Sequence, residues 1–282
     1  MMFMSIDWLS FTFEMNHEQE VLAFELWGRA AAALQRQFPL AYLAFVKDWQ
    51  FTPRMGRAPY NASQQREDKG VMIFAHQRIE HSLVEVGGIG MDTLGNLQAE
   101  LAVLQEVAPR LTRVDIAVDI FTETRPDEFA TQRNTERFTS WSETVSDSGH
   151  TVYIGSKTSD RYARIYRYND PHPRSQFLRV EHVLKAEQAR AAAAQIKEVG
   201  LETFVALIGN TFGWAHQDWT PEVNTDEAAA AWRPERRQGK TVSWMYGTVF
   251  PSLQKLIEDG AVTIADVQKW FGERGIDIGG VS

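Results

Sequence analysis

Tyrosine and arginine alternate in residues 157–170, KTSDRYARIYRYND. The alternating residues are Arg161, Tyr162, Arg164, Tyr166, Arg167 and Tyr168. A phenol has a pKa of about 10, so it needs a nearby cation or base to act as a nucleophile near neutral pH. Arginine supplies the cation and also clamps phosphate groups. The segment is therefore either an ordinary strand with one wet face or a reactive phenol held among cations.

Two further segments, RVDIAVD and RVEHV, alternate charged with apolar residues, as strands with one polar face do. Their polar faces carry Arg113, Asp115, Ala117 and Asp119 in the first segment and Arg179 and Glu181 in the second. His182 belongs to the opposite face and is expected to be structural. Three strands can thus offer acids, arginines and a tyrosine to one site. Cross-strand ion pairs on an exposed sheet, such as Asp119 with Arg113 or Arg179, explain the same spacing.

Composition limits the kinds of site and the cell compartment that the sequence is compatible with. The 282 residues include no cysteine, which excludes disulfides, thiol catalysis and cysteine metal sites. A net charge of -8 argues against a nucleic-acid partner on its own, but residues 157–179 hold six basic and two acidic residues among aromatics. The N-terminus lacks a basic leader and carries Asp7 in its apolar stretch, and no run is long enough to span a membrane. These features predict a cytoplasmic protein with no membrane partner.

Strands and helices follow from the same periodicities. Period two and apolar content predict strands, which come mostly in adjacent pairs, over 5–15, 71–77, 81–86, 110–123, 149–159, 161–169 and 175–185. Helices are predicted over 18–38, 92–107 and 185–208, with a glycine turn at 87–95 and a last helix capped by Thr263 and ending at Gly275. The expected fold class is α+β, a mostly antiparallel sheet covered by helices, with a helical C-terminal region.

Three divisions of the chain are expected. Residues 1–215 form the α+β domain, the polar, proline-containing residues 216–240 read as a linker, and residues 241–282 form the helical C-terminal region. A helical pair in this last region is one candidate for reading bases, although a plain packed pair explains it as well.

An ordered series of segments resembles the replication initiation factor family, the rolling-circle initiators of plasmids and filamentous phages and related relaxases. The segments are IDWLSFTF, TRVDIAVDIF, TVYIGSKTSDRYARIYRY, RVEHVLK and TVSWMYGTVFPSLQKL, between about residues 5 and 258. The resemblance implies sequence-specific, metal-dependent nicking of one DNA strand at an origin. A tyrosine would attack the phosphodiester and leave a 5′-phosphotyrosyl enzyme and a 3′-OH primer.

The resemblance also assigns residues. Tyr166 falls on the family's arginine–apolar–tyrosine step and is the expected nucleophile, with Tyr162 as the alternative. Arg161, Arg164 and Arg179 are the expected phosphate or DNA contacts. Asp115, Glu181 and Glu85 are the expected ligands of Mg²⁺ or Mn²⁺, ions that prefer oxygen donors.

Partners and rival functions follow from the same resemblance. It implies an origin with a hairpin-forming inverted repeat, a host helicase and a homodimer. The chain reads YRYND where relatives commonly have a lysine after the tyrosine, which favours an alternative: a non-nicking DNA-binding replication or regulatory protein of the same family. A relaxase of an integrative conjugative element and an unrelated metal-dependent hydrolase using Asp115 and Glu181 also remain open.

Overall fold

The computed structural model describes most of the first 212 residues and short pieces of the C-terminal region. The described residues are 2–15, 23–55, 59–60, 62–75, 81–131, 141–146, 149–167, 175–212, 255, 257–259, 262–263 and 265–266. The chain divides into two compact units, Met1–Pro234 and Glu235–Ser282. The predicted linker 216–240 and most of 241–282 lie outside the described residues, so the three predicted divisions stay predictions.

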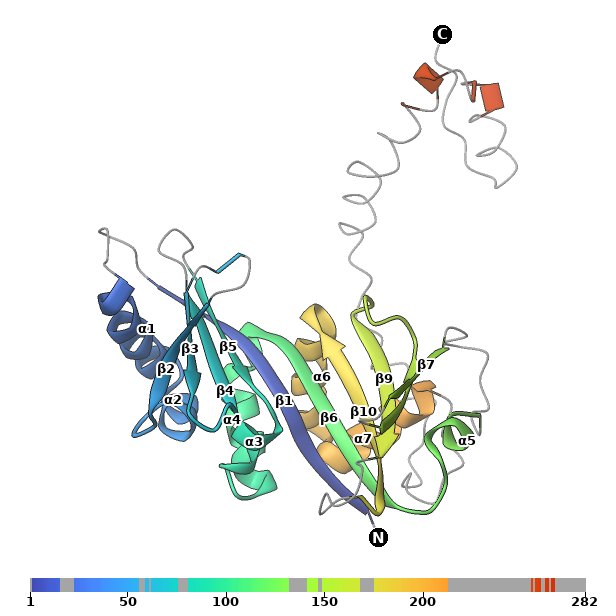
Figure 1. Ribbon diagram of the computed structural model, residues 1–282, viewed down its shortest axis with the longest axis horizontal. Coiled ribbons are helices and arrows are strands. Elements are labelled where there is room, and N and C mark those ends of the chain that lie inside the picture. Colours follow the sequence, from blue (N-terminus) through green and yellow to red (C-terminus); the bar gives the residue numbers. More distant parts are fainter. Residues whose placement is uncertain are drawn as a thin grey trace. The chain divides into compact units, whose positions relative to one another are not determined.

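One ten-stranded antiparallel sheet organises the first unit (Figure 1). Its strands are β1 (Met2–Glu14), β2 (Phe51–Met55), β3 (Ala62–Arg66), β4 (Val71–Ala75), β5 (His81–Val86), β6 (Leu111–Phe121), β7 (Trp141–Ser146), β8 (Gly149–Ile154), β9 (Arg161–Arg167) and β10 (Phe177–Lys185). Their order across the sheet is β2-β3-β4-β5-β1-β6-β10-β9-β8-β7. The long strands β1, β6 and β10 therefore lie at the centre, and β9 flanks them.

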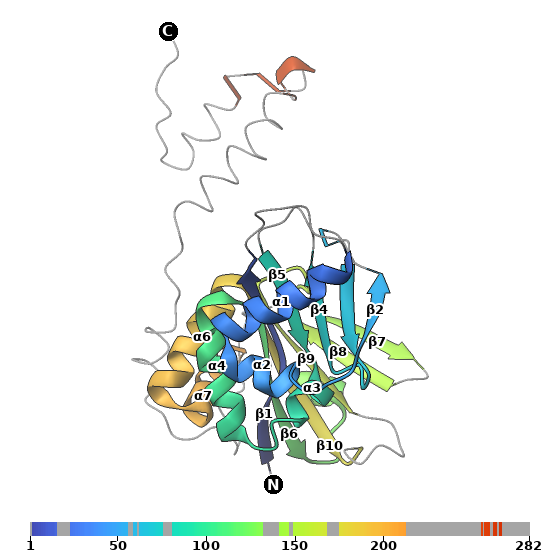
Figure 2. The same ribbon diagram turned by 90° about the vertical axis from the view of Figure 1, so that its left-hand side faces the viewer.

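Helices cover one face of this sheet (Figure 2). The described helices are α1 (Ala23–Gln37), α2 (Pro39–Phe45), α3 (Gly88–Asp92), α4 (Leu97–Val107), the 3₁₀ turn Ala108–Arg110, α5 (Pro126–Thr131), α6 (Ala186–Val199) and α7 (Leu201–Phe212). In Figure 2 α1, α2, α4, α6 and α7 gather on the same side, and α4 and α6 pack directly on β1 and β6. Because the larger helices share that side, the opposite face of the central strands is free to present polar groups. The α+β fold class predicted from sequence is confirmed.

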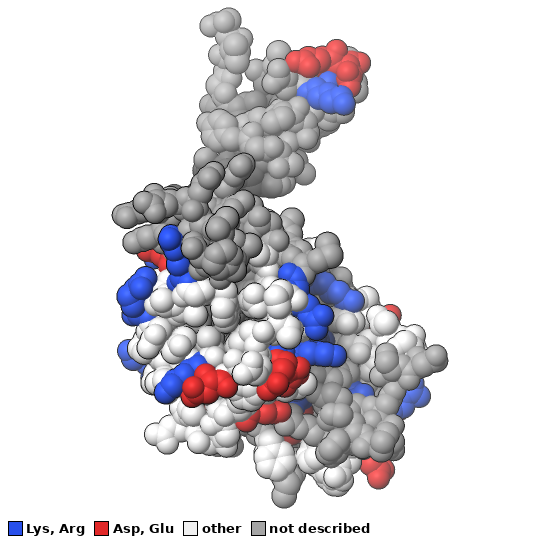
Figure 3. Space-filling view, turned by 60° about the vertical axis from the view of Figure 1, so that its left-hand side comes forward, with Lys and Arg blue, Asp and Glu red and all other residues white. Residues whose placement is uncertain are grey.

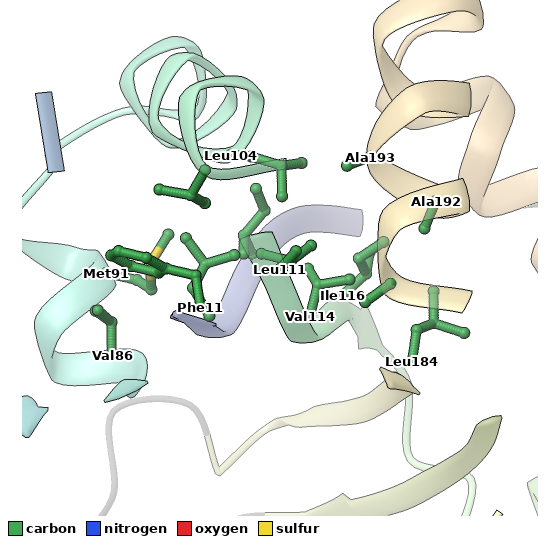
Figure 4. Packing of buried hydrophobic residues seen from close by; sticks show 14 of the residues in the cluster. Phe11, Val86, Met91, Leu104, Leu111, Val114, Ile116, Leu184, Ala192 and Ala193 are labelled. Atoms are coloured by element: carbon green, nitrogen blue, oxygen red, sulfur yellow. The ribbon is translucent and has the colours of Figure 1, made fainter. Parts of the chain in front are cut away.

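The core lies between the central strands and the helices. Val114, Ile116 and Val118 of β6 are fully buried, which is the apolar face that period two predicts. In Figure 4 Leu111 lies beneath Leu104 of α4, Ile116 lies on the side of α6, and Ala192 of α6 lies over Leu184. Alanine on the inner side of α6 lets the helix approach the sheet closely, so the strands beneath it are held rigidly.

Several boundaries differ from the sequence expectation. The helix predicted over 185–208 is two helices, because Gly200 adopts a positive φ of 83° that ends α6. Pro39 begins α2 in addition to following α1, as proline suits the first turn of a helix. The glycine turn expected at 87–95 contains the short helix α3. In the second unit, the Asp266 amide donates to Thr263 Oγ1 at 3.1 Å, which confirms the predicted cap, whereas the predicted end at Gly275 lies outside the described residues.

Sequence reasoning also missed elements. It gave no strand at β2, β3 or β7 and no helix at α5, since these segments are short and polar. Charges of both signs occur in small groups over the surface seen in Figure 3, separated by uncharged residues. None of the helices in the described ranges is long and apolar enough to span a membrane.

Candidate active site

Strands β6, β10 and β9 place the predicted side chains in neighbouring cross-strand rows. In one row Asp119 pairs with Arg179, which pairs with Tyr166. In the next row on the same face, Glu181 pairs with Arg164. Alternation along each strand directs all five side chains to the sheet face opposite α6, which buries Ile116 and Val180 on the other side.

Tyr166 is bonded to a buried carboxylate. Its Oη donates a hydrogen bond to Glu181 Oε1, and Arg164 Nε donates to the other oxygen, Glu181 Oε2. Glu181 is fully buried, while the Arg164 side chain keeps 27% of its surface exposed. The Arg164 guanidinium also lies 5.9 Å from the Tyr166 ring centre. A phenol, an acceptor for its proton and a partly exposed cation thus meet at one point of the sheet.

Arg179 is held by carboxylates. Its Nε and Nη2 both lie 2.6 Å from the two oxygens of Asp119, and its Nη1 lies 2.5 Å from Asp7 Oδ1. Its side chain is 1% exposed, so it is built into the sheet face. This is the Asp119–Arg179 ion pair that sequence reasoning left as an alternative. As placed here, Arg179 orients acids around Glu181, whose Oε1 is 4.0 Å from Nη1.

Asp115 belongs to the same cluster through two arginines. It accepts from Arg113 Nε at 2.8 Å and from Arg113 Nη2 at 2.6 Å, and its Oδ2 lies 3.4 Å from Arg164 Nη2. Asp115 is completely buried. Arg164 therefore contacts both Asp115 and Glu181, two of the three acids predicted as metal ligands.

Asp7 completes the cluster, and the sequence analysis did not assign it to the site. The β1–β6 register pairs Ile6 with Ile116 and Trp8 with Asp115, which leaves Asp7 as the extra residue of a β-bulge. A bulge re-aims one side chain, and here it turns the Asp7 carboxylate to Arg179 and to within 4.0 Å of Arg164. The available signal was a lone acid between Ile6 and Trp8, but no sequence pattern marks the bulge.

Burial and crowding set the charge state of the acids. Burial, and then the neighbouring Asp7 carboxylate, raise the pKa of Glu181 to about 7, against the opposing effects of Arg164 and the Tyr166 hydrogen bond. Burial also raises the pKa of Asp115, although Arg113 opposes it. The carboxylates raise the pKa of Arg164 despite its burial. Near neutral pH, Glu181 can therefore both accept and release a proton, while Arg164 stays charged.

The other predicted residues differ in their relation to this cluster. Tyr162 adjoins it: through Val183 it shares a cross-strand row with Asp115. Tyr162 is 8% exposed, and burial raises its pKa, which disfavours the phenolate. Arg161 lies three residues before Arg164 on β9, so its side chain belongs to the opposite face of the sheet. Glu85 of β5 pairs with Ser10 of β1. Because β5 lies three strands from β10, the register puts Glu85 roughly 20 Å from Glu181. Tyr168 lies outside the described residues.

His182 lies on the face opposite to Glu181, as expected. It is fully buried on the helix side of β10, with its ring 5.2 Å from that of Phe212. Burial lowers its pKa to about 3, so it stays neutral.

The cluster fits a divalent cation in charge and donor type. Four carboxylates (Asp7, Asp115, Asp119 and Glu181) face three guanidiniums (Arg113, Arg164 and Arg179), so one negative charge is uncompensated when all are ionised. Hard carboxylate oxygens are the donors that Mg²⁺ and Mn²⁺ prefer. Over the described ranges, however, no three acids or histidines stand ready as a ligand group. The arginines occupy the oxygens that a cation would use.

Comparisons with known proteins show a likeness in fold. No protein-family model and no curated protein sequence matches the chain. Among solved structures, the fold is similar to that of a rolling circle replication initiator protein from Geobacillus stearothermophilus. The TM-score is 0.54 at 19% identity, over 74% of this chain and 85% of that one. At this identity the likeness establishes a shared fold.

Proposed function

We propose that this protein is a rolling-circle replication initiator that nicks one DNA strand at an origin, with Tyr166 as the nucleophile. The observation that carries the proposal is the hydrogen bond from Tyr166 Oη to the buried Glu181, beside the partly exposed Arg164. The fold shared with a replication initiator supports the class of activity.

In the proposed step, Tyr166 Oη attacks the phosphorus of the scissile phosphodiester. Glu181 takes the phenol proton as Oη bonds to phosphorus. The bond from phosphorus to the 3′-oxygen breaks, and that oxygen takes up a proton to become the 3′-OH. The 5′ side remains attached to the enzyme as a phosphotyrosyl ester. Arg164, charged and 27% exposed, offsets charge on the phosphoryl oxygens.

We further propose Mg²⁺ or Mn²⁺ as the cofactor, held by Asp115, Glu181 and Asp7. Asp7 replaces Glu85 as the third ligand, because Glu85 lies too far from Glu181. When bound, the ion would withdraw charge from the phosphoryl oxygens. Asp119 and Arg179 would position these acids without touching the DNA. The cation would also balance the excess negative charge of the carboxylate cluster.

A matched pair of variants tests the proposal. Supercoiled plasmid carrying the DNA that flanks the coding region is incubated with protein and Mg²⁺ or Mn²⁺, and nicked circles and protein–DNA adduct are counted. We expect Tyr166→Phe to abolish the adduct and Tyr162→Phe, on the same strand and face, to keep it. Adduct formation by Tyr166→Phe at the wild-type rate would rule out the assignment.

A second candidate function is DNA binding without cleavage. It is favoured by the YRYND sequence and by the arginines that occupy the carboxylate oxygens. Metal-independent binding of the same plasmid with no nick from the wild-type protein would support it. Under either function the hairpin-forming origin, the helicase and homodimer partners and the cytoplasmic location stay proposals.

A further inference from the structure

Three phenylalanines form an exposed patch on the polar face of the sheet. Phe177 of β10 lies between Phe3 of β1 and Phe121 of β6, with ring centres 5.8 and 5.7 Å apart in edge-to-face contacts. Phe3 is 53% exposed and Phe121 is 57% exposed. We call Phe3, Phe121 and Phe177 the phenylalanine platform. Neighbouring aromatic rings left this open to solvent usually mark a contact site.

Strand register places the platform beside the proposed nucleophile. Phe3 pairs with Asp119, which pairs with Arg179 and then with Tyr166, so one cross-strand row joins them. Phe121 and Phe177 pair with each other two residues further along, which is about 7 Å. Since two-residue steps keep the face, the rings lie on the same side of the sheet as Tyr166.

Cations flank the tyrosine at the other end of β9. Lys157 Nζ lies 3.5 Å from the ring centre of Tyr153, and Lys185 Nζ lies 4.9 Å from that of Tyr162. Lys157 is exposed. Along the direction of β9, Tyr166 therefore lies between an uncharged aromatic platform and a pair of lysines.

We propose that the phenylalanine platform stacks unpaired bases of the DNA strand whose phosphate is presented to Tyr166. Every base has an apolar π face, so exposed rings bind single strands with little sequence preference, while lysines bind the phosphates. The charge pattern fits this occupant: bases meet the uncharged rings, and the backbone continues toward Lys157 and Lys185. The proposal rests on the proposed function for the position of the strand, but base stacking itself requires neither metal nor cleavage.

Binding of a fluorescein-labelled oligothymidine strand without metal tests the platform. Stacking is worth about 1–3 kcal/mol per base, so Phe121→Ala should weaken affinity roughly 5- to 150-fold. Phe121→Trp keeps a π face and should bind within a few-fold of wild type. Phe121→Leu keeps an apolar side chain without a π face and should bind like the alanine variant. Leu43→Ala is the control, because Leu43 is 53% exposed on α2 and lies outside the platform.

Three results would decide against the platform. Equal affinity of wild type and Phe121→Ala for the single strand overturns the platform. Wild-type affinity of Phe121→Leu for the strand also overturns it, because it would show that apolar contact is enough. A change of sedimentation in Phe121→Ala with unchanged DNA affinity assigns the patch to a second copy of the chain. If the stacking results hold but no adduct forms on plasmid, the platform stands and the nicking proposal fails.

Discussion

Replacing Glu181 by glutamine should make the stability of the protein less sensitive to alkaline pH. Glu181 is fully buried, and its pKa is raised from 4.5 to about 7, mainly by burial and then by Asp7. The folded protein therefore holds this proton over a pH range in which the unfolded chain has lost it. The stabilisation is complete below pH 4.5 and is lost as pH rises through 7.

The size of the effect follows from the shift. A change of about 2.5 pKa units corresponds to about 3.4 kcal/mol, of which about 2 kcal/mol falls between about pH 5.5 and pH 8.5. Glutamine is neutral at both values and keeps an oxygen that can accept from Tyr166. Between these two pH values, the free energy of unfolding should therefore fall by about 2 kcal/mol less in Glu181→Gln than in wild type.

Urea unfolding of both proteins at the two pH values measures this difference. Comparing the variant with wild type cancels titrations that the two proteins share. Asp7→Asn is a useful companion, because removal of the neighbouring charge should lower the Glu181 pKa and shrink the loss. Parallel pH dependence in wild type and Glu181→Gln would refute the raised pKa, and with it the idea that Glu181 accepts a proton near neutral pH.

Three further predictions concern other parts of the chain. Arg179→Leu should lower the free energy of unfolding by about 3–5 kcal/mol, measured in urea, because it leaves buried carboxylates without their cation. Arg125→Leu is the control: its side chain is 65% exposed, so the loss should be under about 1 kcal/mol. Equal losses would contradict the buried network. Gly200→Ala should lower the free energy of unfolding and Gly28→Ala should raise it, each by about 1 kcal/mol, because neither new Cβ meets an atom within 4 Å and only Gly200 has a positive φ, of 83°. Changes of the same sign in urea unfolding would contradict this. Lys157→Gln should reduce the slope of log affinity against log salt for oligothymidine by about 0.7, the value for one phosphate contact on a single strand, whereas an unchanged slope would remove Lys157 from the strand's path.

The alternation of apolar and polar residues along the strands predicts much of the fold and part of the site. The alternation in RVDIAVD and RVEHV predicts which side chains share a face, and the structure places Asp119 beside Arg179 and Arg164 beside Glu181 accordingly. Alternation is local, so it holds wherever the strand is regular. It says nothing about which strands are neighbours, and the order β6-β10-β9 was not predicted.

The remaining features depend on irregularity or on long-range pairing. Asp7 reaches the cluster through a β-bulge that no alternating pattern reveals. Glu85 lies on a strand three positions from Glu181, a separation that only the sheet order shows. The break at Gly200 was hidden in an alanine-rich run, because local propensity favours helix on both sides.

The most direct test of the account is to identify the residue attached to DNA. After reaction with plasmid carrying the flanking DNA and Mg²⁺ or Mn²⁺, the covalent product is digested with nuclease and trypsin and analysed by mass spectrometry. We expect a nucleotide on the peptide that carries Tyr166. A nucleotide on Tyr162 or on another side chain, or origin binding with no adduct at all, would contradict it.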